Sequence, residues 1–185
     1  MGGVNWVIRR AGAKRPGNWV RRAGAKRPGN WVLLTAVALI VLQLVLRAVL
    51  AFQGYFYWDD LILTGRAGTQ GLLSPSYLFD DHDGHVMPAA FLIAGGITRL
   101  APLNWLGPAI SLIVLQLVGS LALLRALWVI LGWRPVLLVP LAFALFTPLG
   151  VPAYAWWAAA LNSLPMIAAL AWVCADAILL VRTGN

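Results

Sequence analysis

Residues 32–52 have the sequence VLLTAVALIVLQLVLRAVLAF, which is apolar except for Thr35, Gln43 and Arg47. A helix of this length, at about 1.5 Å per residue, reaches roughly 30 Å, the thickness of the hydrocarbon core of a bilayer. A secretory signal is the competing interpretation, but this stretch is longer than the apolar part of a usual signal, and further apolar stretches follow it. The stretch therefore predicts a first transmembrane helix.

The composition of the whole chain agrees with a membrane protein. Hydrophobic residues make up 61% of it, charged residues only 11%, and the mean hydropathy is +0.81. Soluble domains have about 25% charged residues, so this chain has too few polar groups to cover its apolar surface in water. Further apolar stretches are residues 86–100, 108–131, 136–147 and 161–182.

These stretches predict an all-α, polytopic transmembrane helix bundle of four or five spans over residues 32–182. Five spans result if the short stretch 86–100 crosses the membrane, as its hydropathy favours, and the C-terminus then lies outside. Four result if that stretch is re-entrant, which places Arg125, Arg134 and Arg182 on the cytoplasmic side, as the positive-inside rule favours. Both alternatives stay open at this point.

The positive charge of the chain is concentrated before the first span. Residues 9–20 and 21–32 are two identical copies of RRAGAKRPGNWV, and they hold eight of the 14 basic residues. Residues 1–31 lack apolar periodicity, so we expect a disordered cytoplasmic tail and a multi-pass protein of the cell membrane. Membrane lipid is its expected partner, at about 1 kcal/mol per Lys or Arg near anionic headgroups, and no nucleic acid is expected.

The acidic charge is concentrated in residues 53–85, which should form an outer loop. Short apolar pieces in this loop predict interfacial helices. Five of the six acidic residues of the chain lie here: Asp59, Asp60, Asp80, Asp81 and Asp83. Adjacent carboxylates repel one another, so either a pKa rises or a cation neutralises them. The alternative is an ordinary solvated loop, since Asp is common in turns.

If the loop is functional, it suits a general base or a divalent cation. Oxygen ligands favour Mg²⁺ or Mn²⁺, and Asp81 and Asp83 are the candidate metal ligands. The nearby imidazoles of His82 and His85 would shift the preference toward Mn²⁺ or Zn²⁺.

Charged residues within the spans are the other candidates. Arg47 shares a helix face with Gln43, and its side chain is expected either to face the bundle interior or to extend to the outer surface. If Arg47, Arg125 and Asp176 line a path, the chain is part of a transporter. If Gln116 and Ser120 mediate helix contacts, the chain is a non-catalytic subunit with a membrane-protein partner.

Three motifs carry a family resemblance: Trp58-Asp59-Asp60, the DGHVMP sequence of residues 83–88, and the WWAAALNSLP sequence of residues 156–165. With them, residues 32–182 resemble the N-terminal part of GT-C-type membrane glycosyltransferases, which use polyprenyl-phosphate sugars, and related actinobacterial membrane proteins. Members of this class have more spans and further loops that hold the lipid phosphate. The resemblance therefore implies an N-terminal part of such an enzyme, inactive alone.

The resemblance also implies residue roles on the outer face. Asp59 or Asp60 would be the base on the acceptor hydroxyl, with His85 as a further catalytic residue. Asp81 and Asp83, with His85, would orient the acceptor or a metal ion such as Mg²⁺ or Mn²⁺. Arg47 and Asp83 are the candidates for contact with the polyprenyl-phosphate sugar.

Overall fold

The computed structural model describes residues 30–184, and the fold in this range is helical, as predicted. Three helices are long and apolar enough to cross a membrane: α1 (Asn30–Phe52), α5 (Leu106–Leu131) and α8 (Trp157–Thr183). Two apolar stretches, Pro88–Leu100 and Pro135–Phe146, form helices shorter than that. The structure thus supports a membrane-embedded helical protein, while helix length alone accounts for three of the four or five predicted spans.

The first and last spans differ slightly from the predicted boundaries. Helix α1 begins at Asn30, so the tail predicted to be disordered lies almost wholly outside the described residues. Helix α8 begins at Trp157 rather than at residue 161, and Pro165 lies inside it. A proline removes one backbone donor, which neighbouring helices can compensate in a membrane protein, so Pro165 does not mark the start of the helix.

The acidic loop and the stretch after it form a small folded unit, residues 59–100, which we call the end module. It contains α2 (Asp59–Thr69), α3 (Pro75–Leu78), a hairpin of β1 (Asp81–His82) and β2 (His85–Val86), and α4 (Pro88–Leu100). Leu63, Tyr77 and Phe91 are fully buried in its core. The Tyr77 hydroxyl donates to the Phe91 carbonyl oxygen at 2.8 Å, and the two helices that form from the loop, α2 and α3, both pack against α4.

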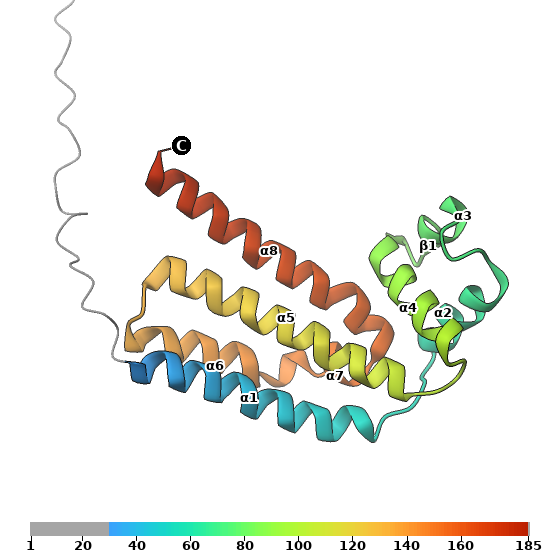
Figure 1. The fold of residues 1–185 in the computed structure, drawn as a ribbon, viewed down its shortest axis with the longest axis horizontal. Coiled ribbons are helices and arrows are strands. Elements are labelled where there is room, and N and C mark those ends of the chain that lie inside the picture. The colour runs from blue at the N-terminus through green and yellow to red at the C-terminus, as the bar shows by residue number, and fades with distance from the viewer. Residues whose placement is uncertain (1–29, 185) are drawn as a thin grey trace, which may run out of the picture.

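The end module lies at one end of the long helices, where α1 ends and α5 and α8 begin (Figure 1). We call this the module end. The other end, where α1 begins and α5 and α8 finish, carries Arg134 between α5 and α6 and Arg182 near the end of α8, and we call it the basic end.

A broken segment runs beside α1 from the basic end back toward the module end. It consists of η2 (Pro135–Leu137), α6 (Leu138–Phe146), η3 (Pro148–Gly150) and α7 (Pro152–Ala155). Each piece except α6 begins with a proline, which is favourable at the first helical position and cannot continue the helix before it. The prolines therefore explain why this stretch is not one long helix.

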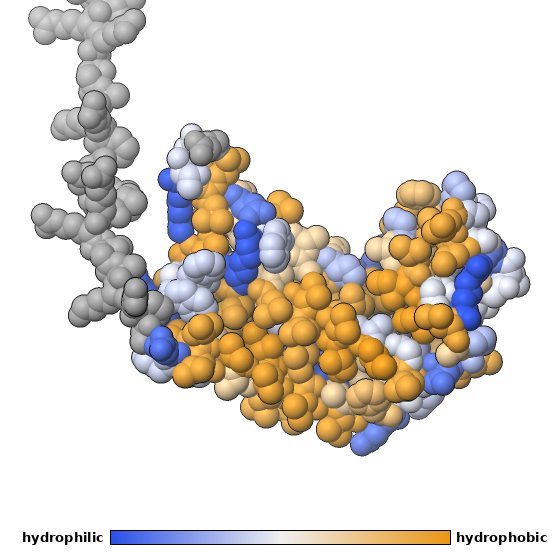
Figure 2. Space-filling model, viewed as in Figure 1, coloured by the Kyte–Doolittle hydropathy of each residue, from blue (hydrophilic) through white to orange (hydrophobic). Residues whose placement is uncertain are grey.

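The surface of the long helices is apolar. Figure 2 shows a broad band of hydrophobic side chains over α1 and α5, with hydrophilic groups toward the two ends. Leu34, Val41 and Val45 of α1 and Leu170 and Val173 of α8 are each more than half exposed. Such a band is expected where lipid is the solvent.

Candidate functional site at the end module

The two adjacent aspartates at the start of α2 have different surroundings. Asp60 is fully buried, and each of its carboxylate oxygens accepts a backbone N–H. Tyr57 N–H donates to Oδ2 at 2.9 Å and Ala158 N–H donates to Oδ1 at 2.7 Å. Ala158 lies in the first turn of α8, where backbone N–H groups have no partner within the helix. Asp60 therefore caps α8 from another helix and ties the end module to the bundle.

Burial has a direct effect on the Asp60 carboxyl. Desolvation raises its pKa above the ordinary value, the two backbone N–H donors lower it in part, and the neighbouring Asp59 charge raises it further. Because both oxygens already hold donors and no side-chain surface is exposed, Asp60 is a structural group rather than a base that a substrate can reach.

Asp59, by contrast, faces the hairpin. Its carboxylate Oδ2 lies 4.0 Å from His82 Nε2, and its side chain is 15% exposed. Asp59, His82 and Asp83 each offer a ligand atom, and these atoms lie within 4.8 Å of one another. Two carboxylate oxygens and one imidazole nitrogen form a ligand set that suits Mn²⁺ or Zn²⁺. We call these three residues the acidic–imidazole cluster.

A tight turn brings His82 and Asp83 to this position. Asp81 pairs with Val86 and His82 with His85, so Asp83 and Gly84 form a two-residue hairpin loop. Both loop residues have positive φ, 52° and 79°, as a type I′ turn requires, and Asp-Gly is a favoured sequence for it. The turn points Asp83 back toward α2.

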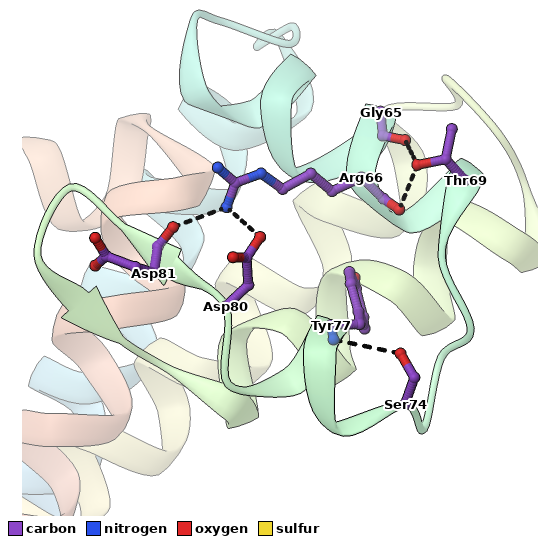
Figure 3. A network of polar contacts seen from close by, with 7 residues as sticks. All are labelled: Gly65, Arg66, Thr69, Ser74, Tyr77, Asp80 and Asp81. Atoms are coloured by element: carbon purple, nitrogen blue, oxygen red, sulfur yellow. Dashed lines mark hydrogen bonds and ion pairs between the residues drawn. The ribbon is translucent and has the colours of Figure 1, made fainter.

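Arg66 of α2 contacts the two residues at the start of the hairpin. Its guanidinium Nη1 lies 3.1 Å from the Asp80 carboxylate and donates to the Asp81 carbonyl oxygen at 3.2 Å (Figure 3). The Asp81 side chain points away from Arg66 in this view. Asp80 is thus paired with a cation, and Arg66 fixes the strand that leads into His82.

The structure places the remaining predicted residues of the loop as follows. Asp81 is exposed and lies outside the acidic–imidazole cluster, although it is adjacent to His82. His85 is exposed, and because it is the direct cross-strand partner of His82, its side chain projects from the same face of the hairpin. Of the predicted site residues, the structure brings Asp59 and Asp83 together. The Asp60 carboxylate is instead bound by two backbone N–H groups, and the Asp81 side chain points away from Arg66.

The charged residues of the spans do not meet at one point. The guanidinium of Arg125 donates to the Asp176 carboxylate and lies 4.3 Å from the centre of the Trp172 ring. Arg47 contacts Gln116, which precedes Arg125 by nine residues on α5, a rise of about 13 Å along the helix. A transport path that requires Arg47, Arg125 and Asp176 to converge is not favoured by this arrangement.

A groove of about 560 Å³ lies between α2 and the end of α4, with Leu61, Gly68, Thr98 and Arg99 in its lining. Leu61 is two positions after Asp59, or about 200° around the helix, so the groove opens on another side of α2. The acidic–imidazole cluster is a surface site, not part of this groove.

Two residues of the cluster's environment were absent from the sequence-based site. From the sequence, His82 was named only for its effect on the preference for one metal over another and not as one of the candidate ligands, and Arg66 was not predicted to position the hairpin. An Asp-Gly pair flanked by alternating residues is a strong hairpin signal, and it would have placed His82 and His85 opposite each other. Nothing in the sequence indicates that Arg66 reaches Asp80, because that contact depends on how α2 packs.

Comparisons of the chain with protein-family models, with curated proteins and with solved structures find no match. Function is therefore inferred from the chemistry of the site itself.

Proposed function

We propose that the protein crosses the membrane four times, with α1, α5 and α8 as continuous crossings and α6, η3 and α7 as one broken crossing. Helix α4, about 20 Å long at 1.5 Å per residue, packs beside α2 in the end module, which supports a location at the surface for it. Non-helical backbone in the broken crossing is acceptable because it packs against α1.

The proposed orientation has the basic end in the cytoplasm and the end module outside. Arg134 and Arg182 lie at the end where α1 begins, and the basic residues 9–27 directly precede that end in the chain. Positive charge flanking the spans is retained on the cytoplasmic side. This arrangement agrees with the four-span alternative, in which both termini are cytoplasmic.

A labelling experiment tests this orientation. Cys174 is the single cysteine, so a Cys174→Ser background permits one new cysteine at a time. A membrane-impermeant maleimide should label Asp81→Cys in intact cells and Thr183→Cys only after the membrane is opened. The reverse pattern would refute the orientation and any outer-face chemistry.

For activity, we propose that the end module supplies the cation site of a metal-assisted glycosyl transfer from a lipid-linked sugar phosphate at the outer membrane surface, as the N-terminal part of a larger enzyme that is inactive alone. The observation that supports it is the convergence of Asp59, His82 and Asp83 beside the membrane-embedded helices. A divalent ion there would be suited to the negative charge of a phosphate leaving group. The family resemblance of residues 58–60 and 83–88 supplies the substrate class.

The bond changes of this reaction assign a role to the remaining imidazole. A new C–O bond forms at the anomeric carbon, the bond from that carbon to the phosphate oxygen breaks with its electron pair, and the acceptor hydroxyl loses a proton. His85 projects beside His82 and is exposed, so it is suited to accept that proton. Asp60 is excluded from this role by its two backbone hydrogen bonds.

Mn²⁺ binding to the purified protein, followed by electron paramagnetic resonance, tests the cation site. Asp59→Asn and His82→Gln should each weaken Mn²⁺ binding by about tenfold or more, since each removes a ligand. Asp81→Asn and His85→Gln are matched controls on the same hairpin, and they should leave Mn²⁺ affinity unchanged. Equal Mn²⁺ affinity in wild type and Asp59→Asn would refute the site.

Transfer activity is measured separately, with a radiolabelled polyprenyl-phosphate sugar in native membranes that contain the protein together with its membrane partners. His85→Gln should lose transfer while it keeps Mn²⁺ affinity. Transfer at the wild-type rate in both Asp59→Asn and His85→Gln would refute the proposed chemistry.

A further inference from the structure

A second polar site lies within the bundle, away from the acidic–imidazole cluster. A cavity of about 210 Å³ is formed between α1 and the break after α6. Its lining comprises Gln43, Leu46, Arg47, Leu50, Leu145, Phe146, Thr147 and Tyr154. Leu46 and Leu50 are about half exposed on the apolar surface of α1, so the cavity borders the region that lipid occupies.

Arg47 is the only charged side chain in that lining, and its nitrogens are fixed by neutral groups. Nη2 donates to the Leu145 carbonyl oxygen at 2.6 Å, and Nη1 donates to Gln116 Oε1 at 3.4 Å. With the Gln43 amide oriented so that its oxygen faces Arg47, that oxygen accepts from Nε at 2.8 Å. The guanidinium carbon lies 4.4 Å from the centre of the Tyr154 ring.

These contacts hold the guanidinium in place but do not neutralise it. Arg66 and Arg125 each have a carboxylate partner, Asp80 and Asp176. Within residues 30–184, no carboxylate lies at ion-pair distance from Arg47. The carboxyl-terminal end of α6, where Leu145 lies, supplies only partial negative charge. A cation in a bilayer without a full counter-charge is costly, which favours an anion at this position.

The depth of Arg47 matches a lipid headgroup. It lies five residues before the end of α1 at the module end, which is about 8 Å along the helix axis. The phosphate of a phospholipid can reach an arginine this close to the surface if it moves slightly inward, and the acyl chains of that lipid then lie along Leu46 and Leu50.

We propose that this cavity binds an anionic phosphate group, that of a phospholipid in the leaflet at the module end, with Arg47 as its counter-charge. The guanidinium is planar and suited to phosphate, and its neutral contacts orient it in advance. The site is independent of the proposed cation site, because it shares no residue with the acidic–imidazole cluster, and the phospholipid proposed here replaces the lipid-linked sugar as the ligand of Arg47.

Native mass spectrometry of the full chain tests the lipid site. The protein is reconstituted in nanodiscs of equal phosphatidylglycerol and phosphatidylcholine, and the lipids retained after release are counted. Wild type should retain phosphatidylglycerol in preference, and Arg47→Gln should reduce that preference by about tenfold, the loss expected for one charged hydrogen-bonding group. Arg47→Lys keeps the charge and should keep most of the preference.

A matched control comes from the other membrane-embedded arginine. The double variant Arg125→Gln with Asp176→Asn removes a paired arginine and its partner, so phosphatidylglycerol retention should equal that of wild type. If Arg47→Gln does not fold, Leu50→Trp fills the cavity and leaves Arg47 in place, and it should abolish the lipid preference in a folded protein.

A thermal-shift measurement distinguishes lipid from free phosphate. In detergent without phosphatidylglycerol, inorganic phosphate at matched ionic strength should stabilise wild type and not Arg47→Gln if the site accepts free phosphate. Stabilisation only by phosphatidylglycerol would identify the lipid as the source. If folded Arg47→Gln and Leu50→Trp retain phosphatidylglycerol as wild type does, and phosphate shifts neither, the proposal is wrong.

Discussion

Replacement of Asp60 tests the connection between the end module and the bundle. In Asp60→Ala, the Ala158 N–H in the first turn of α8 loses its acceptor at a buried position. The Tyr57 N–H also loses its acceptor, but Tyr57 is exposed and water can replace the carboxylate there. The main effect should therefore come from the start of α8.

The magnitude follows from these two donors. A buried, unsatisfied N–H costs about 1–3 kcal/mol, and a solvent-accessible one costs roughly 0.5 kcal/mol or less. Removal of the carboxyl group offsets part of this cost, because burial disfavours the charged form of that group. We therefore expect Asp60→Ala to lower the free energy of unfolding by about 2 kcal/mol, and Asp60→Asn, which keeps one acceptor oxygen, by about 1 kcal/mol.

The pH dependence provides a second test of the same residue. Burial raises the pKa of Asp60 in the folded state, so between the ordinary value of about 3.9 and the raised value the folded protein binds more protons than the unfolded chain. The contribution of Asp60 to the free energy of unfolding is therefore greatest below about pH 4, and it falls as the pH rises from there to the raised pKa. Asp60→Asn should lack this slope.

Denaturant unfolding in detergent micelles, monitored by tryptophan fluorescence from pH 3 to pH 8, would measure both effects. Asp81→Ala is the control, because it removes an exposed aspartate from the same module. The reasoning fails if the unfolding free energies of Asp60→Ala and Asp81→Ala agree to within about 0.5 kcal/mol, the usual range for a surface substitution.

Four further substitutions test the end module. Gly95→Ala would place a Cβ 2.5 Å from Leu72 Cδ1 and 2.7 Å from the buried Tyr77 hydroxyl. The free energy of unfolding, measured by thermal unfolding, should therefore fall by about 1–3 kcal/mol. At the neighbouring Gly96, an added Cβ has no atom within 4 Å, so Gly96→Ala should raise the free energy of unfolding by about 0.5–1 kcal/mol. Equal effects at the two positions would contradict the observed packing of α4. Gly84→Ala, at φ 79°, should strain the hairpin turn and weaken Mn²⁺ binding, whereas unchanged Mn²⁺ affinity would argue against the role of the turn. Arg66→Met breaks an ion pair that is about one-third exposed, so it should change the free energy of unfolding by less than about 1 kcal/mol but accelerate amide exchange at Asp81 and His82, an acceleration that Thr69→Ala should not show.

The sequence predicted the helices well where composition alone controls them. The stretches that became α1, α5 and α8 are long and apolar, and only a spanning helix satisfies their backbone groups in lipid. The short stretch 86–100 was ambiguous, because its 13-residue helix is compatible with a tilted crossing or a surface location. Its packing against α2 supports the surface location proposed above, and packing is a tertiary property.

The candidate site was predicted only in outline. The clustering of aspartates in residues 53–85 located it, and Asp59 and Asp83 do meet. The difference between Asp59 and Asp60 could not be predicted, because adjacent residues of the same type are separated only by which helix face packs inward. His82 entered the site through a hairpin turn, and Arg47 met Leu145 across 98 residues of sequence.

The amino-acid sequence by itself determined that this chain forms apolar helices with a basic end and an acidic loop, since hydropathy and charge are properties of each segment alone. The tertiary structure decided which charged groups are neutralised. Asp60 is held by the first turn of α8, Arg125 is paired with Asp176, and Arg47 is left facing a cavity with only neutral partners. These outcomes depend on contacts between distant helices, because the interaction of a buried charge falls with distance and with the polarity of its surroundings.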